Sequence, residues 1–216
     1  MKLTDTTDAL MTELKLYGLK ETLPSRLKEL QVQHWSPSEF LNLCLEDERL
    51  YRQNARLARR LREAGFPVTA SLENLDFTVD RKLNRSQIRE MISASFVSQS
   101  RNVLIAGPTG VGKTHLACAL GQAACRQGLT TLFFSLNRLL EKIALTRAQG
   151  RYLSLLRKLT SASCLVIDDF GLRALTPQQL QDIYDLVDGR VENLTTIVTT
   201  QFPVENWSEI LPDPVL

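Results

Sequence analysis

A stretch of eight residues limits what this chain can fold into more than any other part of it. It reads G-P-T-G-V-G-K-T, follows the apolar run Val103–Ala106 and precedes the apolar positions of a predicted helix. The pattern G-x-x-x-x-G-K-T between a strand and a helix is typical of a phosphate-binding loop. Its glycines let several backbone N–H groups point at one anion, with the positive end of the helix behind them. We therefore expect an α/β nucleotide-binding core.

The residues of this loop have separate expected roles in binding ATP. Lys113 supplies a mobile positive charge for the β- and γ-phosphates and is a catalytic candidate, and Thr114 offers a hydroxyl to Mg²⁺. The other positions expected to contact the nucleotide are Gly107, Pro108, Thr109, Gly110, Val111, Gly112 and His115. A chance glycine turn is the alternative, and the apolar runs on both sides of the loop argue against it.

A second apolar run, Cys164–Ile167, ends in two adjacent acids, Asp168 and Asp169. Four consecutive apolar residues indicate a fully buried strand, and α/β sheets bind ligands at the carboxyl ends of their strands. Asp168 is expected to hold Mg²⁺ opposite Thr114, and Asp169 to orient or deprotonate the attacking water. A turn or cap built from two aspartates is the alternative.

Two further ligand contacts are predicted outside these motifs. Residues 195–201 form another buried strand with a polar tip, where Thr200 and Gln201 could sense whether the γ-phosphate is present. Structural capping is the alternative for both residues. Phe77, in the segment before the core, could pack on adenine, although a single aromatic residue is more often a buried anchor.

The order of the predicted elements divides the chain into three parts. Residues 1–66 are predicted to form a small all-α domain, 67–100 a connection into the core, and 101–216 the α/β core with a parallel sheet flanked by helices. The first helix is expected to stop at Gly18. The third begins at a capping box, Ser36–Glu39, and should run to Ala64 with Gly65 as its stop.

The second half of that third helix has the most unusual composition in the chain. Six arginines and no acid lie between positions 49 and 62. The residues that we predict to bind DNA are Arg49, Arg52, Arg56, Arg59 and Arg60. The first four recur at spacings of three and four, which gives one stripe suited to sequence-independent, salt-sensitive contact with DNA phosphates. A solvated basic face near a helix C-terminus is the alternative.

Net charge, cysteine spacing and apolar runs limit which ligands and which compartment the sequence suggests. The net charge of +2 gives no global field that points to nucleic acid, so local clustering must carry that argument. The four cysteines are widely spaced and form no C-x-x-C pair, which favours buried thiols over a zinc site. We find no apolar signal core and no run of the ~18–20 residues that a membrane span needs. We expect a soluble cytoplasmic protein that does not bind a membrane.

Three segments together resemble the AAA+ helper ATPases of the IstB type, which are related to the DnaC-type helicase loaders. These segments are Gly107–His115, Leu165–Leu172 and Val198–Pro203. The helical module carries matches as well, namely S-P-S-E-F-L, E-D-E, R-L-A-R-R-L-R and F-P-V. The Walker motifs are generic to many ATPases, whereas their combination with an arginine-rich helical module is far more specific.

The resemblance implies an AAA+ P-loop NTPase that binds duplex DNA without sequence preference. Such a bacterial protein would form a homo-oligomer, a ring or a filament with nucleotide at its subunit interfaces, and would recruit or stimulate a partner transposase in insertion-sequence transposition. By motif position, Lys113 and Thr114 correspond to Walker A, Asp168 and Asp169 to Walker B, and Gln201 to sensor I, where asparagine is usual. Because Asp169 is one methylene shorter than the usual glutamate, hydrolysis is expected to be slow and assembly-dependent.

The resemblance also implies a C-terminal lid that carries arginines for the nucleotide of the neighbouring subunit. The sequence ends soon after Pro212, Asp213 and Pro214, and no such lid arginine is present, so we expect this chain to lack the lid. Arg190, at the end of a core helix, is a weak substitute.

Two alternative functions remain open. In a replicative helicase loader of the DnaC type, the arginine stripe would face an acidic partner helix instead of DNA. A small-molecule kinase built on the same loop would need a substrate pocket and an acceptor for the phosphoryl group. The double aspartate and the polar strand tip argue against the kinase.

Overall fold

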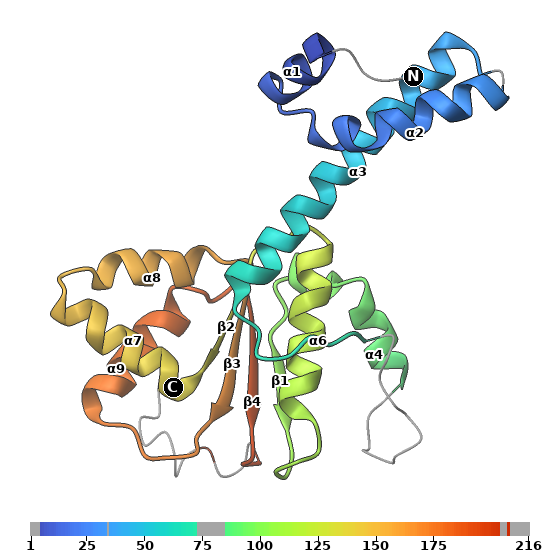
Figure 1. Cartoon of the computed structure of the whole chain (residues 1–216). Coiled ribbons are helices and arrows are strands. Elements are labelled where there is room, and N and C mark those ends of the chain that lie inside the picture. The colour runs from blue at the N-terminus through green and yellow to red at the C-terminus, as the bar shows by residue number, and fades with distance from the viewer. Residues whose placement is uncertain (1–4, 34, 73–84, 204–206, 208–216) are drawn as a thin grey trace. The chain divides into compact units, whose positions relative to one another are not determined.

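The computed structural model describes residues 5–33, 35–72, 85–203 and 207 (Figure 1). It divides into two compact units, residues 1–59 and 60–216, and each is described by itself below. The first unit is all-helical, and the second contains the parallel sheet.

The helical unit contains α1 (Asp5–Glu13), α2 (Tyr17–Gln33) and most of α3 (Pro37–Ala64). The capping box predicted at the start of α3 is confirmed. The Ser36 N–H donates to Glu39 Oε2 at 2.8 Å, and the Glu39 N–H donates to Ser36 Oγ at 3.3 Å. The predicted end of α3 at Ala64 is also confirmed.

The prediction that Gly18 ends the first helix is wrong. Helix α1 ends at Glu13, Lys15 adopts a φ of +56°, and Gly18 lies in the first turn of α2. A Cβ added at Gly18 would lie 2.4 Å from the Cβ of Tyr51 and 3.0 Å from the carbonyl oxygen of Asp47. Glycine is therefore required here by the close approach of α2 to α3, because any side chain would clash with the neighbouring helix.

The second unit is built on a four-stranded sheet in the order β1-β4-β3-β2, with every neighbouring pair parallel. Its strands are β1 (Val103–Ala106), β2 (Thr131–Ser135), β3 (Cys164–Phe170) and β4 (Thr195–Thr200). In a parallel sheet the carboxyl ends of all strands lie at one edge, so the loops that follow β1, β3 and β4 come together there.

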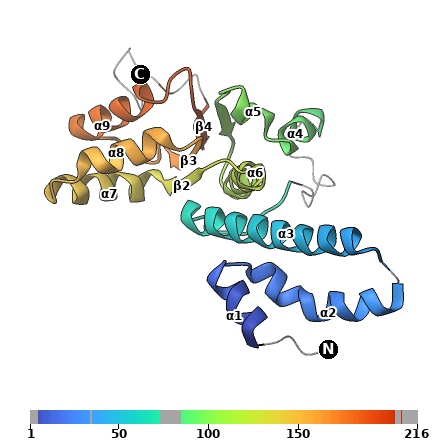
Figure 2. The ribbon, with the colours of Figure 1, turned by 90° about the horizontal axis from the view of Figure 1, so that it is seen from above.

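Helices cover both faces of this sheet (Figure 2). One face packs on α4 (Arg85–Ile92), α5 (Ser95–Ser98) and α6 (Lys113–Arg126); the other packs on α7 (Leu136–Ala148), α8 (Tyr152–Ser161) and α9 (Pro177–Asp188). Successive side chains of β3 point to opposite faces of the sheet and so contribute to the hydrophobic core on each face. Cys164 and Val166 pack on the α6 side, and Leu165 and Ile167 on the other side. No helix in the described part of the chain is both long and apolar enough to cross a membrane.

All four cysteines are buried, as the sequence predicts. Burial raises the pKa of Cys118 to about 11 and that of Cys164 to about 12, and thiolates rather than thiols react with disulfide reagents. We expect Ellman's reagent at pH 8 to modify none of the four thiols rapidly in the native protein, and all four in denaturant. In mild denaturant Cys44 should react first, since it lies in the smaller helical unit. Rapid native modification of Cys118 or Cys164 would contradict the burial described here.

Candidate functional site

The loop between β1 and α6 has the backbone geometry that a phosphate ligand requires. Gly110 and Gly112 adopt φ values of +84° and +98°, a region that favours glycine, and a Cβ added at either would meet no atom within 4 Å. Gly112 is the N-cap of α6 and provides no side-chain cap, so the N–H groups of the first turn lack that partner. Backbone N–H groups at such a helix start bind anions. The loop therefore fits the phosphates of a nucleotide.

Lys113 lies over this loop and is 8% exposed. Its Nζ donates to the carbonyl oxygen of Pro108 at 3.0 Å. The loop is also tied to the sheet, because the Gly107 N–H donates to the Thr200 carbonyl oxygen at 3.2 Å. The ammonium group thus lies within the loop that would surround a phosphate.

Thr114 and Asp168 come together although 54 positions separate them in the chain. The Thr114 hydroxyl lies 2.9 Å from Asp168 Oδ2 and 3.1 Å from Oδ1, and Asp168 is 4% exposed. Hydroxyl and carboxylate oxygens are the ligands that Mg²⁺ prefers in proteins. The residues present therefore fit a magnesium ion beside the phosphate loop.

Asp169 lies at an irregularity of the sheet. It adopts a φ of +59°, and the register between β3 and β4 shifts at this point. Its backbone N–H donates to Thr199 Oγ1 at 3.0 Å. Burial raises the pKa of the Asp169 carboxyl and the neighbouring Asp168 raises it further, while the charge of Lys113 opposes both. A carboxylate with a raised pKa is a better proton acceptor, which suits a general base.

The two residues predicted to sense the γ-phosphate make different contacts. Gln201 Oε1 accepts a hydrogen bond from the Thr109 hydroxyl at 2.8 Å, so this side chain touches the phosphate loop itself. The fully buried Thr200 hydroxyl donates to the Phe170 carbonyl oxygen at 3.0 Å and accepts from the Phe202 N–H at 3.1 Å. Both partners of the Thr200 hydroxyl are backbone groups, which agrees with the alternative that this residue has a structural capping role.

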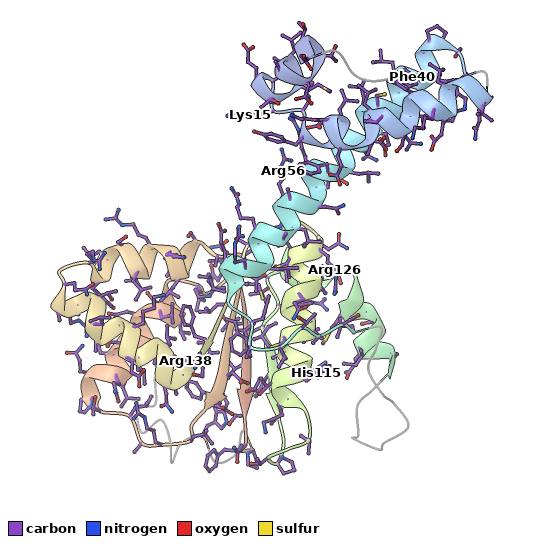
Figure 3. The ribbon with its side chains drawn as sticks, in the orientation of Figure 1. Lys15, Phe40, Arg56, His115, Arg126 and Arg138 are labelled. Carbon is purple, nitrogen blue, oxygen red and sulfur yellow. The ribbon has the colours of Figure 1, made fainter. Side chains whose placement is uncertain are left out.

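Two other predicted nucleotide contacts are exposed to solvent. Val111 is exposed in the loop, and His115 is exposed in the first turn of α6 (Figure 3). Phe77 lies outside the described residues.

The acids upstream of the arginine stripe pair with two of its members. Arg49 forms an ion pair with Glu46, and Arg52 Nε donates to Glu48 Oε1 at 2.6 Å. Glu48 is 6% exposed and also accepts the N–H of Leu19 at 3.0 Å. These two arginines are therefore paired with acids that precede the stripe, and Arg52 belongs to the polar contacts that hold α2 on α3.

The remaining predicted DNA-binding residues differ among themselves. Arg56 (Figure 3) and Arg59 are both exposed on α3. Arg56 has no hydrogen-bonding or ion-pair partner among the described residues. Arg60 belongs to the other unit, where its Nε donates to the Cys125 carbonyl oxygen at 3.1 Å, at the end of α6. Arg56 is thus the stripe residue whose replacement removes no contact of the described fold.

Arg190 is not placed to serve a neighbouring subunit. It is 2% exposed and donates to the carbonyl oxygens of Leu159, Ala162 and Thr195. Burial lowers its pKa to about 10. Because its guanidinium group binds the C-terminal end of α8 and the start of β4, the suggestion of a substitute trans-acting arginine is wrong.

The sequence-based search missed two groups near the two aspartates. The Thr199 hydroxyl donates to Asp168 Oδ1, and neither composition nor motif distinguishes this threonine from its neighbours in the T-T-I-V-T-T run. A cavity of about 820 Å³ is lined by Asp168 and Asp169 and also by Arg138 and Lys142 of α7. A spacing of four residues, which would place two cations on the same face of a helix, was the signal present in the sequence.

Comparison with known protein sequences gives a consistent family. A model described as IstB-like ATP binding protein matches residues 9–216. An insertion sequence ATP-binding protein of Sinorhizobium fredii is 36% identical over 209 residues, which covers 97% of this chain and 85% of the relative. An ATP-binding protein of insertion sequence IS21 from Pseudomonas aeruginosa is 32% identical over 209 residues and covers 97% and 79%.

Comparison with solved structures gives the AAA+ P-loop fold. The DnaC helicase loader aligns with a TM-score of 0.57 and 25% identity, covering 66% of this chain and 86% of that chain. DnaI aligns with a TM-score of 0.57 and 22% identity, covering 71% and 80%. The replication initiator DnaA, bound to AMPPCP and single-stranded DNA, aligns with a TM-score of 0.55 and 20% identity, covering 64% and 43%. The predicted α/β core is confirmed.

Proposed function

The chain belongs to the family of IstB-like ATP binding proteins, and from this membership we propose that it is an ATP-dependent regulator that assembles on duplex DNA and recruits or stimulates the transposase of its insertion sequence. The observation that carries the proposal is the contact between the Thr114 hydroxyl and the Asp168 carboxylate. It joins the phosphate loop to the acidic strand end in a chain whose relatives are insertion sequence ATP-binding proteins.

In this proposal, the loop N–H groups and Lys113 bind the phosphates of ATP, and Thr114 and Asp168 hold Mg²⁺. The metal neutralises charge on the phosphate oxygens when it is bound. Asp169 orients a water molecule and accepts its proton as the water oxygen bonds to the γ-phosphorus. The bond from that phosphorus to the β–γ bridging oxygen breaks, which leaves ADP and inorganic phosphate. The short side chain of Asp169 supports slow turnover that depends on assembly.

Gln201 supplies the proposed link between nucleotide state and assembly. Its amide oxygen accepts from Thr109 in the phosphate loop, and it directly follows β4, which lies next to the strand of Asp168. A phosphate that draws the Thr109 hydroxyl away would release the Gln201 side chain from the loop. Since Arg190 is buried, any arginine that reaches the nucleotide across a subunit interface is another residue.

The proposed DNA contact is the exposed arginine face of α3, and it can be tested by salt dependence. Each phosphate that a cation neutralises contributes about 0.9 to the slope of log K against log salt. We expect Arg56→Gln to lower that slope by about 0.9 on random-sequence duplex DNA. Adding Arg49→Gln should lower it by about as much again, because an exposed pair such as Arg49–Glu46 costs little to break.

The matched control for this prediction is Lys28→Gln, which removes one exposed positive charge from α2 in the same helical unit. Its slope should equal that of the unchanged chain. Equal slopes for Arg56→Gln and the unchanged chain would remove the stripe from the DNA interface, and the solvated-face alternative would stand. Arg52 is left intact because its replacement would leave Glu48 without its ion-pair partner.

Two measurements test the proposed function as a whole. Fluorescence anisotropy on a random-sequence duplex at low salt should give tight binding with Mg²⁺ and ATP and much weaker binding without nucleotide. Electron microscopy of the same mixture should give a ring or a filament. Binding and assembly that are indifferent to nucleotide would reject the proposal.

A replicative helicase loader is the second candidate, and the likeness to the DnaC helicase loader over 86% of that chain favours it. The two functions predict different preferences. A transposition regulator should prefer duplex DNA over single-stranded DNA in competition and should retain the transposase in a pull-down. A helicase loader should retain the replicative helicase.

A further inference from the structure

We propose that Thr199 of β4 is a positioning residue for both aspartates of the site, and that its hydroxyl sets the metal-dependent part of nucleotide affinity as well as turnover. The inference rests on the proposed ATPase function and gives a role to a residue for which the sequence alone predicts none. Thr199 does not touch the nucleotide in this account; it acts through Asp168 and Asp169.

The hydroxyl of Thr199 uses both of its hydrogen-bonding capacities on these two residues. It donates to Oδ1 of Asp168 and accepts the backbone N–H of Asp169 at 3.0 Å. Thr199 is fully buried, and Asp168 is 4% exposed, so water does not readily replace either bond. The same carboxylate contacts Thr114 of α6 through both oxygens. Thr199 therefore fixes the orientation in which Asp168 faces the phosphate loop.

The strand register explains why a side chain is needed at this point. Ile167 pairs with Val198 and Phe170 pairs with Thr200, so Asp168 and Asp169 together oppose the single residue Thr199. Two residues opposite one define a β-bulge, in which part of the backbone ladder is lost. The Asp169 N–H finds its partner in the Thr199 hydroxyl instead of in a carbonyl of β4.

This bulge also fixes the direction of the Asp169 side chain. Asp169 adopts a φ of +59°, a conformation that costs energy for a residue other than glycine and that persists only where its surroundings hold it. The bond to Thr199 is a contact that holds it. Without the hydroxyl, the bulge is free to relax and the carboxylate to turn away from the position in which it would meet the attacking water.

Two substitutions separate the hydroxyl of Thr199 from its packing, and a third provides a control. Thr199→Val keeps the branched shape and removes both hydrogen bonds, whereas Thr199→Ser keeps the hydroxyl and removes a methyl group. The control is Thr195→Val. Thr195 is also fully buried in β4, and its hydroxyl donates to the carbonyl oxygen of Phe96 at 3.2 Å, away from both aspartates.

The experiment measures the affinity of a fluorescent ATP analogue with Mg²⁺ and with EDTA, and then kcat and KM for ATP hydrolysis. We expect the ratio of the affinity with Mg²⁺ to the affinity with EDTA to be about tenfold smaller in Thr199→Val, since a hydrogen bond to a charged group is removed. Its affinity in EDTA should stay within about twofold of the unchanged chain, because the phosphate loop is intact. Its kcat should fall by about tenfold or more while KM in excess Mg²⁺ changes less. Thr199→Ser and Thr195→Val should keep both the magnesium gain and kcat.

Each contrary outcome has a definite reading. A Thr199→Val chain that keeps the magnesium gain and kcat overturns the inference. A Thr199→Ser chain as impaired as Thr199→Val also overturns it, because packing rather than the hydroxyl would then be responsible, and equal impairment of Thr195→Val does the same. If Mg²⁺ does not increase the nucleotide affinity of the unchanged chain, both the proposed function and this inference are rejected. If Mg²⁺ increases the affinity of the unchanged chain and of Thr199→Val equally, only the inference is rejected.

Discussion

Asp169→Asn should bind ATP as tightly as the unchanged chain and hydrolyse it at least about 100-fold more slowly, which is the usual contribution of a general base. An amide cannot accept the proton of the attacking water. Asparagine tolerates the left-handed φ of +59°, and the bond from the backbone N–H to Thr199 does not depend on the side chain. The substitution therefore removes the base and leaves the bulge in place. Phosphate release in a single turnover, beside equilibrium binding of a fluorescent ATP analogue, measures both properties.

Glu192 offers a matched control for that substitution. It is an exposed acid that also adopts a left-handed φ, +72°, outside the candidate site. Glu192→Gln makes the same change from carboxylate to amide at the same kind of backbone position, and its turnover should be unchanged. Normal turnover in Asp169→Asn would exclude Asp169 as the base, and the double-aspartate cap would become the better account of that residue.

Lys113→Met should weaken the binding of ATP by about 10- to 100-fold, because a hydrogen-bonded charge at the phosphates is removed. Methionine keeps a flexible apolar stem in a position that is 8% exposed, so the loss should fall on binding rather than on folding. Assembly on DNA that depends on ATP should shift to correspondingly higher nucleotide concentrations. Isothermal titration with a non-hydrolysable ATP analogue measures the change in affinity directly.

The control is Lys28→Met, which removes an exposed lysine from α2 and lowers the net charge by the same amount. Its affinity for the analogue should equal that of the unchanged chain. Lys113→Met with unchanged affinity and an unchanged melting temperature would show that the loop binds no triphosphate, and the ATPase proposal would fail at its first step.

The sequence was sufficient to predict the sheet and the principal site contact. The runs Val103–Ala106 and Cys164–Ile167 are apolar without interruption, which is what a strand covered on both faces requires. Once both are parallel strands of one sheet, their carboxyl ends meet, and the approach of Thr114 to Asp168 follows from topology. The capping box at Ser36 was also predicted correctly, because it depends only on contacts between residues three positions apart.

The features that the sequence did not reveal depend on contacts between distant segments. The role of Thr199 depends on a register shift between β3 and β4, and three other threonines in its strand have the same chemistry. A glycine at position 18 resembles a helix stop in the sequence, but glycine is needed there because α2 approaches Tyr51 of α3 too closely for a side chain. The burial of Arg190 depends on carbonyl groups about 30 positions upstream, and no spacing rule contains that information.

The position of β4 in the sheet also has a consequence for how this protein is made. Strand β4 is the last of the four to leave the ribosome, yet it lies between β1 and β3 and is the strand with which β1 pairs. Until Thr200 has emerged, the nascent chain can pair β2 with β3 but leaves the apolar edge of β3 open, and such edges promote aggregation. The helical unit leaves the ribosome before any strand does, whereas the phosphate loop gains its anchor at the Thr200 carbonyl only near the end of translation.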